Sequence, residues 1–401
     1  VLNPAVVNKL IDAYSTRNYE RREVSGHDQF FATFYRFFVA GIGRESDMLA
    51  EASNRAARQN VHYLELMQSW GMDEARKVAV TGDDIRLDRA MSELVRNEAI
   101  DRIATETIAM VDAVERRMLE SQSCAGANKQ PACDVKIAYL AQVIRTFPRE
   151  QVLAQTLLAA RLIDRDPRYV GLNFVAPEDE PIALRDYRWQ MEMIAAVTRS
   201  LPADKRRVTL HAGELALGLV PPEDLGWHIR EAVDVAGASR IGHGVDIVHD
   251  PDSSELLNRM ASAGVAIEIC LTSNANILQV SGADHPMNLY RRFGVPLTLA
   301  TDDEGVSRID LTHEYQRAIE TYDFTYADVK ALARNALEFS FQPGPGLFAK
   351  RGGTRFSEPC RRQDIRKPLV AGECRQFIDR SEKARLQWNL EKDFVEFEAQ
   401  F

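Results

Sequence analysis

The sequence predicts an α/β protein, a TIM-type (β/α)8 barrel whose first strand is missing from these 401 residues. From about residue 61 onward, short apolar runs rich in aliphatic and β-branched residues alternate with helical patterns. Near-continuous apolar strands joined by helices are typical of parallel strands buried on both faces. We count seven such runs, whereas a barrel of this kind has eight strands, so we expect the first strand upstream of Val1.

The elements are expected in a regular order along the chain. The first 60 residues form a helical segment, in which Asn3 before Pro4 marks a helix start. Strands are predicted at 61–67, 152–159, 168–175, 207–213, 239–244, 264–271 and 294–301, with helices at 186–201, 224–237, 253–264 and 287–294 between the later ones.

Three parts are therefore expected in the chain. The helical segment 1–60 precedes the barrel, which spans 61–340. A helical insertion between the second and third strands, at about 84–147, holds the longest helical pattern and the first cysteine pair. The C-terminal extension, 341–401, is expected to end in a helical tail that packs on the outside of the barrel.

Composition excludes some partners. The net charge is −9, and no basic face is visible, which argues against nucleic acid as a partner. No apolar run approaches the roughly 20 residues of a membrane span. The chain opens with VLNPAVVNKL, which is neither a signal peptide nor a start methionine, so we expect residues upstream. The N-terminal helices and the insertion are candidate surfaces for a homodimer.

Four of the five cysteines lie in irregular stretches, two in each. Cys124 and Cys133 would close one short loop, and Cys360 and Cys374 another. Exposed thiols are uncommon in a reducing compartment, so we expect two disulfides and a periplasmic or secreted protein, with a cytoplasmic one as the alternative. Cys270, in the apolar run VAIEICL, is expected to be buried and inert.

Polar side chains gather where the last four predicted strands end. A lone histidine is usually structural, and an Asp pair after a strand usually caps a helix. Here, however, all of these residues fall at the carboxyl ends of successive strands, where barrels of this kind carry their active sites. They are His211 and Glu214, then His243, then Thr272, Ser273 and Asn274, and finally Asp302 and Asp303.

An ordered set of motifs carries a family resemblance. HAGE (211–214), RIGHG (240–244), LTSN (271–274), DHP (284–286) and TDD (301–303) resemble the adenosine deaminase family of the amidohydrolase superfamily, and GLNFVAPED (171–179) is similar to its fourth-strand segment. The resemblance covers roughly residues 62–336. The cysteine pairs, the insertion and the tail look more like the secreted, growth-factor-related branch or bacterial exported relatives.

The resemblance implies a role for each site residue. One zinc ion would be held by His211 and Asp302, together with two further histidines expected upstream of Val1. Zinc makes hydroxide available near neutral pH for attack on the purine carbon that carries the amino group. Glu214 would protonate the adjacent ring nitrogen, and His243 would orient the water and carry its proton. The purine itself would be contacted by Asp303 and by the backbone of Gly171.

The sequence departs from the family pattern at two points. No His-x-His occurs among its eight histidines, and a chain with two of the four ligands would hold zinc weakly or not at all. The family usually has proline after the Asp pair, whereas this chain has Glu304. Because that loop borders the pocket, the details of substrate recognition stay open.

The resemblance therefore implies a zinc-dependent deaminase of adenosine or 2′-deoxyadenosine, with alternatives. Another 6-aminopurine is the nearest one. A lactonase or phosphotriesterase usually has a bridging lysine on the fourth strand, and GLNFVAPE offers none. A secreted, non-catalytic barrel that acts as a growth factor or binding module is the alternative outside the enzymes, and an upstream His-x-His would argue against it.

Overall fold

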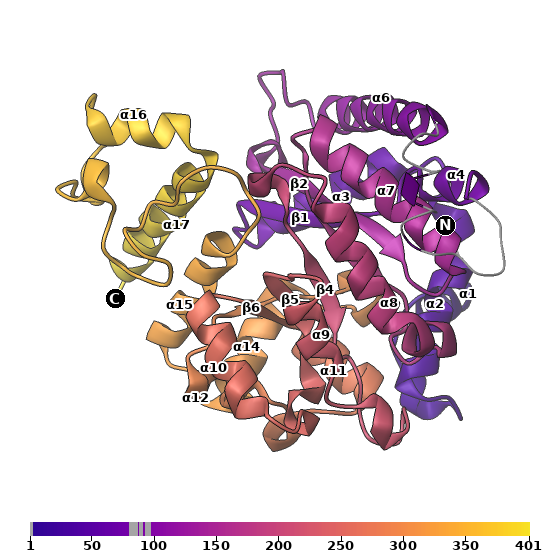
Figure 1. Ribbon diagram of the computed structural model, residues 1–401. Coiled ribbons are helices and arrows are strands. Elements are labelled where there is room, and N and C mark those ends of the chain that lie inside the picture. Colours follow the sequence, from indigo (N-terminus) through magenta and orange to yellow (C-terminus); the bar gives the residue numbers. More distant parts are fainter. Residues whose placement is uncertain (1–2, 80–86, 88–90, 93–97) are drawn as a thin grey trace.

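Seven parallel strands form the centre of the protein (Figure 1). The computed structural model describes residues 3–79, 87, 91–92 and 98–401. One sheet has the strand order β1-β2-β3 and the other has β4-β5-β6-β7. The strands are β1 (Tyr63–Gln68), β2 (Lys136–Ile144), β3 (Tyr169–Val175), β4 (Thr209–Ala212), β5 (Arg240–His243), β6 (Ala266–Ile269) and β7 (Leu297–Leu299).

A parallel bridge between Leu172 and Val208 joins the edge strands of the two sheets. The seven strands therefore follow one another in chain order around a single curved sheet, which confirms the predicted barrel class. Within the described residues, no strand pairing connects β7 to β1.

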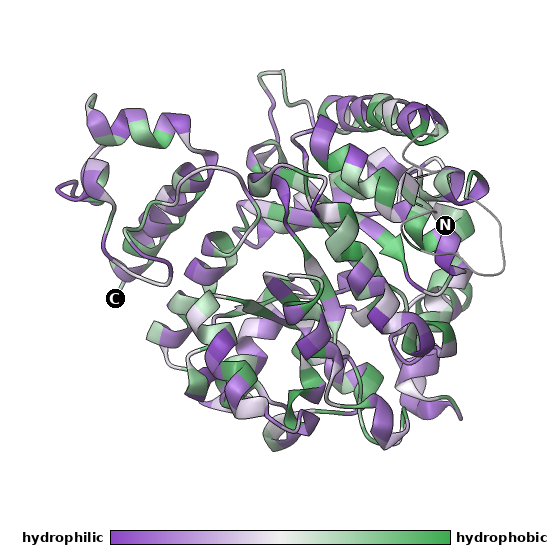
Figure 2. Cartoon of the chain, viewed as in Figure 1, coloured by the Kyte–Doolittle hydropathy of each residue, from purple (hydrophilic) through white to green (hydrophobic). Residues whose placement is uncertain are grey.

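Helices cover the outside of this sheet (Figure 1). Along most of them apolar and polar residues alternate, as expected for helices with one face against a core (Figure 2). The longer ones are α1 (Pro4–Ala13), α2 (Gly26–Gly41), α3 (Glu45–Arg58), α6 (Glu98–Ser121), α7 (Arg149–Arg165), α8 (Pro181–Thr198), α10 (Ser253–Ala263), α14 (Leu311–Tyr322), α15 (Tyr326–Glu338) and α17 (Glu382–Glu398). The shorter ones are α4 (Met72–Lys77), α9 (His228–Asp234), α11 (Leu271–Leu278), α12 (Met287–Phe293), α13 (Glu304–Ser307) and α16 (Glu373–Arg380).

The strand predicted at 152–159 is wrong, because these residues belong to helix α7. The strand at this place in the order is β2, which lies inside the range assigned to the insertion. The error has a physical reason: α7 is buried around most of its circumference, and a short apolar run cannot distinguish a buried helix from a buried strand. The insertion therefore ends before Lys136 rather than at Phe147, and part of its predicted helix lies outside the described residues.

Leu158, in the middle of α7, is fully buried in the main core. We expect Leu158→Ala to lower the free energy of unfolding by about 2–5 kcal/mol, because the lost methyl groups leave a cavity that the sheet cannot fill. Urea denaturation followed by circular dichroism measures this loss. Leu119→Ala, on the exposed side of α6, is the matched control and should change stability by less than about 0.5 kcal/mol.

The C-terminal extension carries α16 and α17 and lies beside the barrel (Figure 1). Arg334 of α15 pairs with both carboxylate oxygens of Glu391 of α17, at 2.6 and 2.7 Å. Lys383 Nζ donates to the carbonyl oxygens of Glu338 and Ser340. These contacts hold α17 against α15 and against the residues that follow it. Among the described residues, no helix has both the length and the apolarity needed to cross a bilayer.

Candidate active site

Three side chains of types that can bind a metal ion meet at the carboxyl ends of the strands. His211 lies in β4, His243 ends β5, and Asp302 follows β7. One ligand atom from each of these residues lies within 4.8 Å of the others. The rings of the two histidines are 5.0 Å apart, centroid to centroid. The structure therefore brings together residues that are 91 positions apart in the chain, at the end of the barrel where the sequence predicted a site.

His211 presents its Nε2 atom to this cluster. Its Nδ1 atom lies 2.9 Å from Oδ1 of Asn173 in β3, and this amide oxygen can only accept a hydrogen bond. The ring is therefore the tautomer with hydrogen on Nδ1, and the lone pair of Nε2 is free. Burial, with the nearby His243 and Arg145, holds the pKa of His211 well below its usual value. A neutral imidazole with a fixed tautomer is the form that binds a metal ion.

His243 carries its proton on the other nitrogen, and a chain of hydrogen bonds fixes it there. The backbone N–H of Met287 donates to Nδ1 of His285, so His285 is protonated on Nε2. That Nε2 donates to Oδ1 of Asn274 (3.1 Å), and Nδ2 of Asn274 donates to Nδ1 of His243 (2.9 Å). His243 is thus left with hydrogen on Nε2.

The surroundings of His243 and His285, the two histidines in this chain of hydrogen bonds, favour the neutral form of both. Burial lowers the pKa of His243, and burial with the neighbouring His243 lowers the pKa of His285 to about 4. An imidazole with hydrogen on Nε2 hydrogen-bonds through that atom and does not ligate a metal with it. His243 and His211 therefore differ in what they can do, although their rings are neighbours. His211 can ligate a metal ion through Nε2, whereas Nε2 of His243 carries a hydrogen and cannot.

Glu214 is a buried carboxyl group in surroundings that favour its protonated form. Burial raises its pKa well above the usual value, and the nearby Asp302 and Glu178 raise it further. Its Oε1 atom lies 3.4 Å from Nδ1 of His243 and has no hydrogen-bond partner among the described residues. A protonated carboxyl group with a free oxygen in a buried site can donate a proton to a ligand.

The turn that carries Glu214 is held by Glu178, which follows β3. The Glu178 carboxylate accepts hydrogen bonds from the backbone N–H groups of Gly213 (3.0 Å) and Glu214 (2.8 Å), and it pairs with Nδ1 of His228 (2.6 Å). Gly213 has φ +72°, and a Cβ there would lie 2.3 Å from Oδ1 of Asp246. Only glycine fits this turn, which fixes the spacing between His211 and Glu214.

The two aspartates after β7 differ in their surroundings. Ser273 Oγ donates to Oδ2 of Asp302 at 2.6 Å, and Asp302 has a left-handed backbone with φ +55°. Such a conformation in a residue other than glycine is often found at functional sites. Burial, with the charge of Asp302 beside it, raises the pKa of Asp303 well above the usual value. Asp302 thus has a carboxylate that a hydrogen bond orients and that could bind a metal ion, whereas the surroundings of Asp303 favour its neutral form.

Gly171 is not brought to this cluster. It is the third residue of β3, far from the strand's carboxyl end at Val175, and a Cβ at Gly171 would lie 2.6 Å from the ring of Phe341. Phe341 stacks with Arg240, which begins β5, so Gly171 lies toward the amino ends of the strands. The residue that follows the tip of β3 is Ala176, whose φ of +84° is unusual for a residue other than glycine.

Glu304, which replaces the family's usual proline, turns toward the N-terminal helices. Its Oε1 atom accepts from Arg55 Nε at 2.5 Å and from Gln59 Nε2 at 3.3 Å. This contact with α3 cannot be read from the sequence, because it joins segments about 250 residues apart. The predicted site also lacks Asn173, Glu178 and His228, although two polar residues in and after an apolar strand, Asn173 and Glu178, are a signal for it.

Asp246, behind the Glu214 turn, gives the site a pH-dependent stability. Its Oδ2 atom accepts from the backbone N–H of Gly226, its Oδ1 atom has no partner among the described residues, and burial raises its pKa from 3.8 to about 7. Between these two values the folded state keeps a proton that the unfolded state has lost, so stability falls as the pH rises. Asp246→Asn removes this titration. We expect the free energy of unfolding of the variant, relative to the parent, to increase from pH 4 to pH 7 in urea denaturation; an unchanged difference would contradict this.

Fold and site together define a (β/α)-barrel protein with a buried His/His/Asp cluster and an adjacent protonated carboxyl group at the strand ends. This is the architecture of the amidohydrolase class. The "Adenosine deaminase" family model matches residues 17–347, so the chain belongs to the adenosine deaminase family.

Individual relatives match a shorter stretch. An adenosine deaminase of Serratia proteamaculans is 40% identical over 136 residues, and one of Pectobacterium atrosepticum is 38% identical over 135 residues. These alignments cover 34% and 33% of this chain and 38% and 37% of the relatives. The chain thus aligns with less than half the length of these curated relatives.

Solved structures share the fold at lower identity. An Arabidopsis N6-mAMP deaminase has a TM-score of 0.53 and 20% identity over 85% of each chain. An adenine deaminase of Arthrobacter aurescens has a TM-score of 0.50 and 17% identity, covering 86% of this chain and 85% of its own.

Proposed function

We propose that the protein is a zinc-dependent aminohydrolase that converts adenosine or 2′-deoxyadenosine to inosine or 2′-deoxyinosine and ammonia. The observation that carries this proposal is the pairing of a protonated Glu214 with a neutral His243, 3.4 Å apart, beside two ligand-type side chains. Membership in the adenosine deaminase family supports it.

The residues present fit a zinc ion in part. His211, through Nε2, and Asp302 would hold the ion, and the hydrogen bonds from Asn173 and Ser273 orient both side chains. Two further histidines, expected from the family upstream of Val1, would complete the set. Zinc, when bound, lowers the pKa of a water molecule so that it is a nucleophile near neutral pH.

The protein's own side chains would then divide the proton transfers. His243, neutral and held by Asn274, orients the attacking water through its Nε2–H group, and the proton that this water loses passes on to the amino group that leaves. Glu214 donates its proton to the purine ring nitrogen next to the carbon under attack, which neutralises the charge that develops there. Asp303, kept neutral, donates a hydrogen bond to the imidazole part of the purine. Ammonia leaves once a proton has reached the amino group.

Ammonia release tests this function directly. Protein from the complete reading frame, supplied with zinc, should release ammonia from adenosine or 2′-deoxyadenosine in a coupled glutamate dehydrogenase assay. Release from adenine alone would move the proposal to another 6-aminopurine. No release from any of the three would refute the deaminase and favour a non-catalytic binding barrel.

The three-part organisation is also a proposal. We infer a helical segment over 1–60, a barrel over 61–340 and an extension over 341–401. The family match ends at residue 347, close to the inferred start of the extension, and α17 belongs to a small apolar cluster of its own around Trp388. A homodimer through the N-terminal helices is the corresponding proposal for assembly.

A periplasmic or secreted location is proposed from the cysteines. The structure pairs Cys124 with Cys133 and Cys360 with Cys374, with Cα atoms 5.5 and 4.6 Å apart, and leaves Cys270 buried as a free thiol. We expect intact-mass spectrometry of the protein from its native compartment to show four hydrogens fewer than the fully reduced chain. A mass equal to that of the reduced chain would contradict the proposed location.

A further inference from the structure

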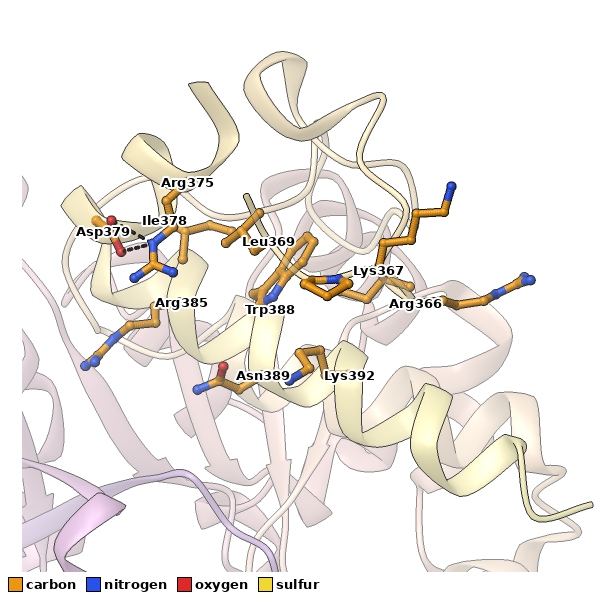
Figure 3. A pocket seen from close by; sticks show the side chains of 12 residues that line it. Arg366, Lys367, Leu369, Arg375, Ile378, Asp379, Arg385, Trp388, Asn389 and Lys392 are labelled. Carbon is orange, nitrogen blue, oxygen red and sulfur yellow. Dashed lines mark hydrogen bonds and ion pairs between the residues drawn. The ribbon is translucent and has the colours of Figure 1, made fainter. Parts of the chain in front are cut away.

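A cavity of about 660 Å³ lies in the C-terminal extension, well outside the barrel's catalytic end (Figure 3). The loop closed by the Cys360–Cys374 disulfide and helices α16 and α17 form its walls. Its lining residues lie between 365 and 392, whereas the family match ends at 347. The volume is typical of a small-molecule site, and the deaminase chemistry does not account for it.

The inner wall of the cavity is apolar and aromatic. Trp388 of α17 lies at its centre, with Ile378 and Leu369 beside it (Figure 3). Trp388 is 4% exposed, so packing fixes its ring and only an edge of the side chain reaches the cavity. The apolar surface open to a ligand comes from the partly buried Ile365 and Leu369 beside that edge.

Around this wall the cavity is lined by positive charge. Its lining has one acidic residue, Asp379, and that carboxylate is bound by Arg375 Nε at 2.9 and 3.0 Å. Arg385 is bound by Glu382 in the same way. The other cationic lining residues are Arg366, Lys367 and Lys392, whose side-chain nitrogens have no hydrogen bond or ion pair with any residue that the structure describes.

The side chains of Arg366, Lys367 and Lys392 lie at the rim of the cavity. Lys392 lies on the same side of Trp388 as Asn389, while Arg366 and Lys367 extend outward from the loop (Figure 3). Their flexible stems let the charged groups turn toward a ligand. The charge is also local: residues 361–392 contain nine Lys and Arg against five Asp and Glu, in a chain with a net charge of −9.

We propose that this cavity binds a small aromatic anion. A planar ring packs against Ile365 and Leu369 at the edge of Trp388, and a phosphate, sulfonate or carboxylate group on the ring is held by Arg366, Lys367 and Lys392. Neither feature is sufficient alone: exposed ion pairs contribute little by themselves, and an apolar wall gives no selectivity for charge. Together they favour a ligand that carries both groups, and binding there is independent of the deaminase reaction.

Isothermal titration calorimetry with three probes tests this ligand class. The probes are 2-naphthalenesulfonate, which has ring and charge, 2-naphthol, which has the ring alone, and inorganic sulfate, which has the charge alone. None is a purine, so the outcome does not depend on the proposed function. We expect naphthalenesulfonate to bind with a lower Kd than either of the others. No binding, or equal binding of naphthol or sulfate, would overturn the proposal.

Two sets of variants locate the binding. The triple variant Arg366→Gln, Lys367→Gln and Lys392→Gln should raise the Kd for naphthalenesulfonate about tenfold. The control triple Arg116→Gln, Arg117→Gln and Lys350→Gln removes the same charge from exposed positions outside the cavity and should change Kd by less than about twofold. An equal effect of both triples would show attraction by net charge alone and would refute the site.

Asn389 supplies a second test that does not depend on removing cations. It is exposed and lines the cavity on the same helix as Trp388, so its substitution leaves the packing intact. Asn389→Glu places a negative charge in the pocket and should weaken naphthalenesulfonate binding, whereas Asn389→Gln should leave it unchanged. An unchanged Kd in the glutamate variant would place the ligand elsewhere.

Discussion

Glu214→Gln is expected to lower kcat by about 10²–10⁴-fold while zinc affinity stays at the parent value. The substitution keeps the size of the side chain but removes the proton that a carboxylic acid donates to the purine ring nitrogen. Burial and the nearby Asp302 and Glu178 keep this acid protonated in the folded protein. Ammonia release measures kcat, and a competition titration with a chromophoric chelator measures zinc affinity.

Two controls keep this result interpretable. Glu223→Gln changes an exposed carboxylate near the same loop and should leave kcat unchanged. The circular dichroism spectrum of Glu214→Gln should match the parent, because the turn is held through Glu178 and two backbone N–H groups rather than through the Glu214 side chain. If Glu214→Gln kept its activity, Glu214 would have no part in proton transfer.

His211→Ala is expected to have the second large effect, on the metal itself. The loss of Nε2 removes one ligand and should weaken zinc binding by at least about 100-fold, beyond the 10–100-fold typical for loss of an orienting partner. Activity at a limiting zinc concentration should fall in parallel. The measurement is zinc content after dialysis against a weak chelator, together with ammonia release.

Two further variants are compared with His211→Ala: Asn173→Ala, for which we expect a smaller loss of zinc, and His313→Ala, which is the control. Asn173 fixes the tautomer of His211 without contributing a ligand, so its loss should weaken zinc binding less than His211→Ala does. His313 is exposed on α14, and His313→Ala should retain the parent's zinc content. Equal zinc content in the parent and His211→Ala would remove His211 from the metal site.

The strand-end residues could be predicted from sequence because their chemistry and the barrel's geometry agree. His211, His243 and Asp302 each end an apolar strand, and parallel strands in a barrel bring their carboxyl ends to one mouth. The order of the strands is therefore enough to predict that these three side chains lie close together. The disulfide partners could be predicted for a similar reason, since each pair closes a short local loop.

Other features could not be read from the sequence. The run at 152–159 is buried at every position, Gln155 and Thr156 included, because α7 is enclosed by the sheet and neighbouring helices, so it lacks the helical period that exposure on one face produces. Gly171 looked like a position for close approach to a ligand, yet its missing Cβ makes room for Phe341 instead. A glycine in the sequence can mark a place where a Cβ does not fit, but it does not show whether a ligand or another side chain occupies that space.

The protonation state of His243 shows a further limit of sequence reasoning. It depends on a path from the backbone of Met287 through His285 and Asn274, three residues that lie between β6 and β7, to a histidine at the end of β5. The DHP and LTSN motifs mark these residues, but only their positions in space reveal the direction of each hydrogen bond. Likewise, the role of Glu304 depends on α3, which precedes it by about 250 residues.

The central claim is that one metal ion binds between β4 and β7, beside Glu214 and His243. Anomalous diffraction at the zinc absorption edge, from crystals of the complete protein grown with zinc, tests it most directly. We expect one strong peak at about 2.0–2.2 Å from both His211 Nε2 and an Asp302 carboxylate oxygen. A zinc peak at another place, with none between these two side chains, would contradict it.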